Sequence, residues 1–232
     1  MIKKPKVDIV ALLPIKAHSE RIRGKNFKLF AGKPLFQWCL DTLLSIKEIK
    51  KVVINTDARQ LLLKNGLIES ARVEVRERKP GLCGDFVSMN LIIADDIANI
   101  PADIYIMTHV TNPLLTAHTI RSALNTFIEE KNKRRHDSLF SVNRYQSRFY
   151  KKDAAPLNHQ PGMLIRTQDL EPIFEENSNL YIFTAGGFRL TGSRIGKSPI
   201  LFETPLGESI DLDSPQHWDI AEQLIISRGI KK

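Results

Sequence analysis

The sequence predicts an α/β protein in which a mainly parallel β-sheet is flanked by helices. Short apolar or β-branched runs alternate with segments of helical periodicity, and most connections between them are short. The first run, residues 8–13, is apolar on both faces, as a central parallel strand requires. With 232 residues, 42% of them hydrophobic and 26% charged, the chain can bury the core of one folded domain.

Strands and helices follow in a regular order after that first strand. Strands are expected at residues 51–55, 72–76, 103–107, 138–142, 180–184, 199–203 and 209–213. Helices are expected to begin at Pro34, after the capping pair Thr56-Asp57, after the loop 78–88, at Thr116 and at Pro215. Strands that alternate with helices in this way predict right-handed crossovers between parallel neighbours.

The alternation lapses between residues 143 and 176. This stretch is polar and aromatic, and Pro156, Pro161 and Gly162 break it into hairpin-like pieces. It is long for a connection in a compact domain, which indicates a function of its own. We therefore expect a single domain over residues 1–232 with an inserted arm at 143–176, which serves either dimerisation or as a flap on the substrate side.

The net charge of +8 suits acidic small molecules and nucleic acid equally well. Lysines and arginines are spread along the chain and are not interleaved with aromatic residues, so we expect no nucleic-acid partner. The apolar segment that follows the lysine-bearing start of the chain (1–8) is cut by Pro14 and is too short to span a membrane. We therefore expect no membrane insertion.

Cysteine usage points to a reducing compartment. Cys39 and Cys83 are the only cysteines, and neither belongs to a CxxC motif or a Cys/His cluster. A zinc site is therefore disfavoured, and two reduced structural thiols in a cytoplasmic protein are expected.

A cationic loop follows the first predicted strand directly. It carries the polar and basic residues Lys16, His18, Ser19, Arg21, Arg23, Lys25, Asn26 and Lys28. Ligands of parallel α/β proteins bind beyond the carboxyl ends of the strands, and so many cations on one loop repel one another unless an anion lies among them. A nucleoside triphosphate fits this requirement; the alternative is a solvated loop that binds nothing.

Two carboxylates share one side of a segment near the end of the chain. In the sequence SIDLD, alternation places Asp211 and Asp213 on one side and Ile210 and Leu212 on the other. Adjacent carboxylates repel each other, and Mg²⁺, which prefers carboxylate and phosphate oxygens, relieves that repulsion. The expected cofactor is therefore Mg²⁺ on Asp211 and Asp213; the alternative is a solvent-facing edge strand.

Other loops predicted at the same edge of the sheet add weaker candidates. Arg78 follows the third strand, His109 follows the fourth, Asn177 precedes the sixth, and Tyr181 lies near its start. Each has an ordinary structural alternative, such as a turn or a solvated loop. The chain lacks GxxxxGK[ST], GxGxxG after a strand, HExxH and GxSxG, so kinase-type P-loop, dinucleotide-binding, zincin and hydrolase-elbow sites are disfavoured.

The motifs together resemble the acylneuraminate cytidylyltransferases, the CMP-sialic acid synthetase family, and the related CMP-Kdo synthetases. The first motif comprises Lys16, Ser19, Lys25-Asn26 and Gly32 to Leu35, and the last is IDLD at 210–213. Between them, in the same order, lie NTD (55–57), RKPGLCGD (78–85), TNPL (111–114), RTQDL (166–170) and the segment 177–182. The resemblance is collinear over nearly the whole chain.

That resemblance implies a Rossmann-like nucleotidyltransferase fold, a homodimer formed through the arm, and cytoplasmic synthesis of a CMP-sugar for cell-surface polysaccharides. The implied nucleotide-binding residues are Leu13, Pro14, Lys16, Ser19, Arg21, Lys25, Asn26, Arg78 and Ser88. The implied sugar-binding residues are His109, Arg166, Asn177 and Tyr181. Lys16, Lys25 and Asp211 are the implied catalytic residues, and Asp211 and Asp213 the implied metal ligands. His109 and Leu115 replace residues usual on the family's acceptor side, so the acceptor is left open among sialic acid-like nonulosonic and 3-deoxy-ulosonic acids.

The expected reaction is attack by the anomeric hydroxyl of a 2-keto-3-deoxy sugar acid on the α-phosphorus of CTP, with release of pyrophosphate. Such a displacement needs positioning and charge neutralisation, which lysine, arginine and Mg²⁺ supply. Two alternatives stay open. One is a nucleotidyltransferase that uses another NTP or sugar, and the other is a non-catalytic nucleotide-sugar-binding protein.

Overall fold

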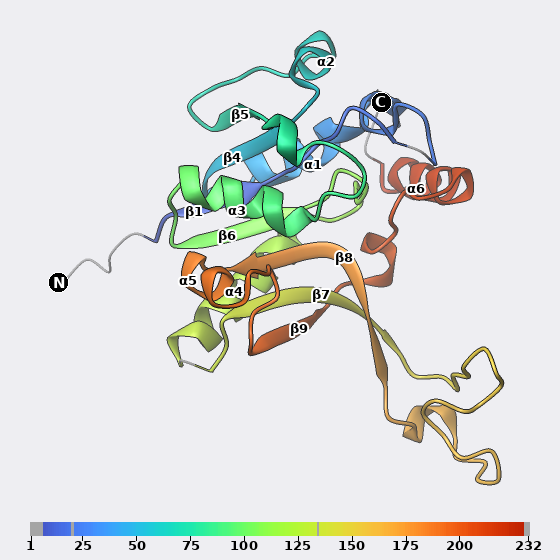
Figure 1. Ribbon diagram of the computed structural model, residues 1–232. Helices are drawn as coiled ribbons and strands as arrows, with labels where there is room; N and C mark the ends of the chain where they lie inside the picture. The colour runs from blue at the N-terminus through green and yellow to red at the C-terminus, as the bar shows by residue number, and fades with distance from the viewer. Residues whose placement is uncertain (1–6, 20, 134, 230–232) are drawn as a thin grey trace.

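The computed structural model describes residues 7–19, 21–133 and 135–229. Its centre is a seven-stranded sheet in the order β5-β4-β1-β6-β8-β7-β9, with helices on both faces (Figure 1). The strands are β1 (Ile9–Leu12), β4 (Ile49–Thr56), β5 (Val73–Glu77), β6 (Ile104–Thr108), β7 (Ser138–Tyr145), β8 (Ile173–Phe183) and β9 (Pro199–Glu203). A separate hairpin pairs β2 (Leu29–Phe30) with β3 (Lys33–Pro34).

Six helices are described, and they pack in three groups. They are α1 (Leu35–Leu44), α2 (Arg59–Lys64), α3 (Met89–Asn99), α4 (Ala117–Asn132), α5 (Ala185–Thr191) and α6 (Pro215–Ser227). The apolar stripes of α1, α2 and α4 enter one core cluster against the sheet, and those of α3 and α5 enter another. The third cluster joins α6 to α1 and the β2–β3 hairpin, where Trp218 meets Phe30 edge to face.

The predicted α/β class is confirmed, and most of the sheet is parallel. β1 pairs in parallel with β4 and β6, β4 with β5, and β7 with β9. β8 runs antiparallel to both of its neighbours, β6 and β7. The reason is that β7 and β8 form the two legs of a long hairpin, so the chain enters β8 in the opposite direction.

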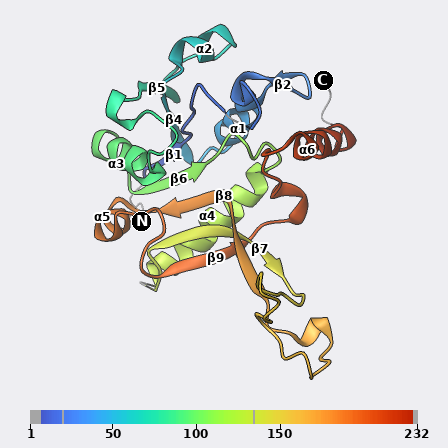
Figure 2. The ribbon, with the colours of Figure 1, turned by 45° about the vertical axis from the view of Figure 1, so that its right-hand side comes forward.

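The arm is the outer part of that hairpin. β7 continues to Tyr145 and β8 begins at Ile173, so both strands reach into the stretch predicted to be irregular, and the predicted strand at 180–184 is the end of a longer one. Figures 1 and 2 show the segment between these strands leaving the body of the molecule.

Two local predictions are wrong. Residues 209–213 are not a strand: the Leu212 N–H donates to the Thr111 carbonyl, and the Asp213 N–H donates back to the Asp211 carbonyl at 2.8 Å, which closes a tight turn. Asp57 does not cap α2, because its Oδ1 accepts a hydrogen bond from the Ala17 N–H of the basic loop at 2.7 Å. Thr56 instead accepts from the Ala58 N–H.

Parts of the first twenty residues lie outside the described ranges. Residues 1–6, in the segment considered above for membrane insertion, and Glu20 of the basic loop lie outside the described residues. No helix in the described ranges has the length and apolar character needed to cross a membrane.

Candidate active site

A left-handed glycine turns the basic loop inward. Gly24 has φ 65°, a conformation that glycine adopts without steric cost, and it precedes the short 3-10 turn Lys25–Phe27. As a result, Lys25 and Asn26 are both only 6% exposed, although they are polar residues on a loop. The Asn26 Nδ2 donates to the Lys16 carbonyl at 2.8 Å and so braces the loop from inside.

The inward turn brings the beginning and the end of the chain together. The Lys25 Nζ donates to the Leu212 carbonyl at 2.7 Å and lies 3.4 Å from Asp213 Oδ1. Arg21 Nη1 lies 2.6 Å from the other oxygen of the same carboxylate, Oδ2. The cationic loop and the predicted carboxylate pair therefore meet at one place.

A cleft of about 440 Å³ lies at this meeting point. Its wall includes the basic loop and the loops after β5 and β6, which leave the carboxyl ends of parallel strands, and the 211–213 turn near the end of the chain. The predicted residues that line it are Pro14, Lys16, Ser19, Arg21, Lys25, Asn26, Arg78, His109, Asp211 and Asp213. One cleft thus holds most of the predicted site.

Lys16, like Arg21 and Lys25, is paired with a carboxylate in this structure. Lys16 Nζ lies 2.7 Å from Asp85 Oδ1 on the loop that follows β5. Its hydrogen bond and charge lower the pKa of Asp85 below the ordinary value. Both side chains are nearly half exposed, so this ion pair contributes little to stability and is available for exchange with an anionic ligand.

Arg78 hydrogen-bonds to strand ends beside the cleft. Its Nη2 donates to the Ile15 and Asn55 carbonyls at 3.1 and 2.8 Å, and its Nε donates to Asn55 Oδ1 at 3.0 Å. These bonds tie the ends of β1 and β4 to the loop after β5. Arg78 is 7% exposed and lines the cleft, so it combines a structural role with a place at the site.

Asp211 offers a carboxylate oxygen that has no partner. Its Oδ1 is buried and makes no hydrogen bond within the described residues. Burial raises the pKa of Asp211, and the neighbouring charge of Asp213 adds to the rise. A buried acceptor in this state is costly unless a cation or donor arrives, and the oxygen donor set of Asp211 and Asp213 fits Mg²⁺. The described residues contain no cluster of three or more His, Cys, Asp or Glu side chains that could hold a metal, so water and substrate oxygens would complete the coordination of Mg²⁺ on the two aspartates.

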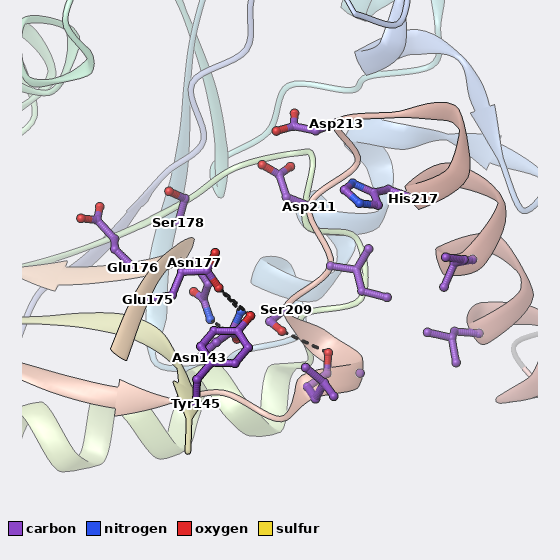
Figure 3. Close-up of a pocket in the computed structure, with 15 residues that line it drawn as sticks. Asn143, Tyr145, Glu175, Glu176, Asn177, Ser178, Ser209, Asp211, Asp213 and His217 are labelled. Atoms are coloured by element: carbon purple, nitrogen blue, oxygen red, sulfur yellow. Dashed lines mark hydrogen bonds between the residues drawn. The ribbon is translucent and has the colours of Figure 1, made fainter. Parts of the chain in front are cut away.

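A second, larger cavity of about 720 Å³ adjoins the cleft, and the two share Ser178, Asp211 and Asp213. Its remaining wall comes from β7, β8, the loop before the 211–213 turn, and α6, and it includes Asn143, Tyr145, Glu175, Glu176 and His217. In Figure 3 the two aspartates lie side by side on the segment that leads into α6 and point toward the part of the cavity where Ser178 and Glu176 lie.

Some predicted nucleotide-binding residues do not line the cleft. The Leu13 side chain is fully buried and packs in the core, because Leu13 continues the apolar face of β1. The Ser88 Oγ accepts a hydrogen bond from the Asn90 N–H, which makes Ser88 the N-cap of α3. Neither side chain belongs to the wall of either cavity.

The predicted sugar-binding residues are dispersed. Asn177 lines the larger cavity, but its amide is engaged by Ser141, Asn143 and Thr204. Tyr181 is fully buried and lines neither cavity. Arg166 lies in the arm, where it pairs with Asp169 at 2.7 Å, and it does not contribute to the cleft of its own chain.

Arg194 and Asp85 are residues of the cleft that were not proposed individually from the sequence. Asp85 belongs to the RKPGLCGD motif, so that motif already pointed to its neighbourhood. Arg194 stands alone in an irregular segment after α5, and no motif or periodicity marks it.

The parallel sheet, the cations at its carboxyl edge and the paired carboxylates form the arrangement expected of an α/β nucleotidyltransferase. The sequence profile of the cytidylyltransferase family matches residues 10–212. The chain therefore belongs to the cytidylyltransferase family.

Characterised relatives share about a quarter of the residues. An N-acylneuraminate cytidylyltransferase of Oncorhynchus mykiss is 28% identical over 95% of this chain, which spans 51% of that protein. A CMP-N,N'-diacetyllegionaminic acid synthase of Legionella pneumophila is 26% identical over 94% of this chain and 96% of its own length. The chain thus spans about half the length of the first relative and nearly the whole of the second.

A solved structure supports the fold. A CMP:2-keto-3-deoxy-manno-octonic acid synthetase complexed with CTP superposes with a TM-score of 0.64 over 95% of this chain and 99% of that chain. The two sequences are 14% identical, so this comparison concerns the fold alone. It confirms the nucleotidyltransferase fold that the motifs implied.

Proposed function

We propose that the protein transfers CMP from CTP to the anomeric hydroxyl of a 2-keto-3-deoxy sugar acid and releases pyrophosphate. The observation that carries this proposal is the pair of adjoining cavities with Asp211 and Asp213 in their common wall. The cationic cleft suits a triphosphate, and the larger cavity, of about 720 Å³, has room for a nine-carbon sugar acid beside it.

In the free protein, carboxylates occupy the places that phosphate groups would take. Lys16 pairs with Asp85, and Arg21 and Lys25 pair with Asp213. On nucleotide binding these cations would turn to the phosphate oxygens and hold them against the loop. Catalysis by Lys16 and Lys25 then consists of neutralising the charge that builds up on the equatorial and leaving oxygens.

Asp211 and Asp213 would hold Mg²⁺, and the unpartnered oxygen of Asp211 supports this assignment. The ion would supply neutralisation of phosphate charge and acidification of a bound hydroxyl. Release of Arg21 and Lys25 toward the phosphates would leave Asp213 free for the same role.

The chemical step is an in-line displacement. The anomeric oxygen forms a bond to the α-phosphorus while the bond from that phosphorus to the oxygen of the leaving pyrophosphate breaks. The hydroxyl proton leaves to solvent, and pyrophosphate takes the negative charge. With the nucleotide in the cleft and the acceptor in the larger cavity, the shared wall at Asp211 would hold the two side by side, and the protein would contribute mainly proximity.

The arm supports the proposal of a homodimer. Several large apolar side chains on it are exposed: Tyr150 (56%), Leu157 (53%), Met163 (55%) and Leu164 (89%). An arm of this composition is suited to bury its surface against a second copy, which would bring Arg166 toward the partner's acceptor cavity. A cytoplasmic location is proposed with it, because CTP and free thiols belong to that compartment.

Pyrophosphate release tests the proposed function. The protein is incubated with Mg²⁺, each of the four NTPs, and N-acetylneuraminic, N,N'-diacetyllegionaminic, pseudaminic and 2-keto-3-deoxy-manno-octonic acids in turn. We expect release only with CTP and at least one acid. Release with another NTP would favour the alternative nucleotidyltransferase, and tight CTP binding without release would favour a binding protein.

A further inference from the structure

A buried acid that takes no part in the proposed mechanism lies behind the nucleotide cleft. Asp96 belongs to α3, and only 1% of it is exposed. The helix packs against the sheet through Ile93 and Ile97, which share a core cluster with Val53 of β4. This packing places the carboxylate beside Asn55, near the carboxyl end of β4. A carboxylate that is buried so deeply needs hydrogen-bond partners, and these partners connect it to the cleft.

Asp96 reaches the cleft through one intermediate side chain. Asn55, which is fully buried, donates from Nδ2 to Asp96 Oδ1 at 2.8 Å. The other end of the same amide, Oδ1, accepts from Arg78 Nε at 3.0 Å. Arg78 lines the cleft, so the three side chains form a continuous chain of hydrogen bonds from α3 to the candidate site.

The charge of Asp96 fixes the direction of this chain. Burial raises the pKa of Asp96 to about 6, so the carboxylate is ionised at neutral pH. An ionised carboxylate only accepts hydrogen bonds. Asn55 therefore presents its NH₂ group to Asp96, and its carbonyl oxygen is left for the Nε of Arg78.

Two charged side chains face Asp96 from its own helix and from the neighbouring strand. Arg76 on β5 donates from Nη1 to Asp96 Oδ1 and from Nη2 to Asp95 Oδ2, the latter at 2.9 Å. Asp95 also pairs with Lys79. Arg76 thus keeps a carboxylate partner when Asp96 is replaced, whereas Asn55 Nδ2 has no second acceptor among the described residues. This difference allows the two acids to be separated by experiment.

Arg78 retains donors for a ligand. Its Nε and Nη2 are engaged by Asn55 and by the Ile15 carbonyl, and its Nη1 makes no hydrogen bond to a described residue. Burial lowers the pKa of Arg78, whereas the negative charges of Asp57 and Asp96 raise it, so the buried acid also supports the charge of the guanidinium. Because the guanidinium is planar and rigid, fixing two of its nitrogens fixes the direction of the third.

We propose that Asp96 and Asn55 are positioning residues for the nucleotide, which hold Arg78 so that its Nη1 donates to oxygen atoms of CTP. The inference rests on the proposed function, since it concerns the cleft assigned to CTP. A guanidinium that is fixed before binding loses less conformational freedom when the ligand arrives. Its effect is therefore on the affinity for CTP.

Calorimetric titration with CTP and Mg²⁺ compares Asp96→Ala with the matched control Asp95→Ala. The control removes the adjacent acid of the same helix and leaves the bond between Asn55 and Asp96 intact. Asp96→Ala should weaken CTP binding about 3- to 10-fold, the size of one lost hydrogen bond, and Asp95→Ala should leave it unchanged. Asp96→Asn keeps an acceptor oxygen and should restore most of the affinity.

Two further variants test whether Asp96 acts through Arg78. In an Arg78→Lys background, which lacks the Nε donor, Asp96→Ala should cause no additional loss of CTP affinity. Asn55→Ser breaks the chain from its other side and leaves the pair of Arg76 and Asp96 in place, so it should weaken CTP binding as Asp96→Ala does. It also provides the test if Asp96→Ala does not fold, which thermal unfolding shows.

Equal losses in Asp96→Ala and Asp95→Ala would overturn the assignment, because both acids would then act only through Arg76. A full additional loss in the Arg78→Lys background, or unchanged CTP affinity in Asn55→Ser, would overturn it as well. Failure of the proposed function is recognised separately, because the unaltered protein would then bind CTP without releasing pyrophosphate with any acid.

Discussion

Lys25 illustrates how a single buried cation joins distant parts of the chain. Its Nζ contacts Leu212 and Asp213, which follow it by almost the whole length of the protein. Burying a charge is costly unless it is paired, and here a carbonyl and a carboxylate provide the partners. At this site cations and carboxylates therefore satisfy each other, and in the proposed reaction phosphate oxygens would replace the carboxylates.

The neutral state of His109 makes a prediction about pH and stability. Since burial lowers its pKa from 6.5 to about 3, the unfolded chain takes up a proton before the folded protein does as the pH falls. This contribution to stability is complete above pH 6.5 and is lost as the pH falls toward 3. His109 can change the free energy of unfolding by at most about 1.4 kcal/mol per pH unit.

Urea unfolding at pH 7, 6 and 5 measures this slope. His109→Gln should flatten the decline in the free energy of unfolding relative to the unaltered protein. His118→Gln, on the surface of α4, is the control, and equal slopes in all three proteins would contradict the prediction.

Among the residues of the candidate site, those that belong to a sequence motif could be predicted, and those outside any motif could not. Lys16, Lys25 and Asp211 belong to the first and last motifs, so their presence at the site was predictable. The inward direction of Lys25 depends on the left-handed Gly24, and that of Asp211 depends on a turn that the predicted strand did not include. Arg194 depends on a turn at Gly192 and on Tyr181 beneath it, and no local pattern encodes that meeting.

At the scale of elements, an irregularity in β8 shapes the wall between the cavities. Phe140 of β7 faces Tyr181, whereas Val142 faces Glu176, so β8 carries extra residues between these pairs. The extra residues include Ser178, which lines both cavities and has φ 57°.

The left-handed conformation of Ser178 leads to a prediction about stability. A β-branched side chain is poorly tolerated in the left-handed region, so Ser178→Val should lower the free energy of unfolding by about 1–2 kcal/mol. Ser178→Gly is the matched control and should cause a smaller loss, because glycine adopts this conformation without steric cost. Chemical denaturation measures both, and equal losses would show that the backbone conformation is not the cause.

Elements with strong periodicity were predictable, and elements defined by distant partners were not. Strands β1, β4, β5 and β6, the first part of β7 and the helices at 35, 89, 117 and 215 follow from apolar runs and caps, whereas the short β2–β3 hairpin was not predicted. The antiparallel direction of β8 depends on the course of the arm, and the turn at 211–213 depends on a bond to Thr111. Neither partner is close in sequence.

At the scale of the whole molecule, the arm is separable from the sheet. Tyr145 and Ile173 face each other at the base of the hairpin, so an Asn-Gly turn in place of residues 146–172 should preserve the strand register. We expect this deletion to fold and to be monomeric in sedimentation velocity, whereas the full chain is dimeric.

A dimeric deletion variant would place the interface elsewhere, and a monomeric full chain would exclude the proposed homodimer. As a control for the new turn, Leu164→Glu disturbs the exposed apolar surface of the arm without shortening it. It should weaken the dimer while leaving the thermal unfolding of the body unchanged.

The proposed activity of the whole molecule requires one magnesium–nucleotide complex held between the basic loop and the 211–213 turn. Calorimetric titration of CTP, with and without Mg²⁺, measures this most directly. The unaltered protein and Asp219→Asn, which changes an exposed carboxylate on α6, should bind CTP more tightly when Mg²⁺ is present. Asp211→Asn should remain folded and lose that magnesium dependence. Retention of the full magnesium effect by Asp211→Asn would contradict the central claim.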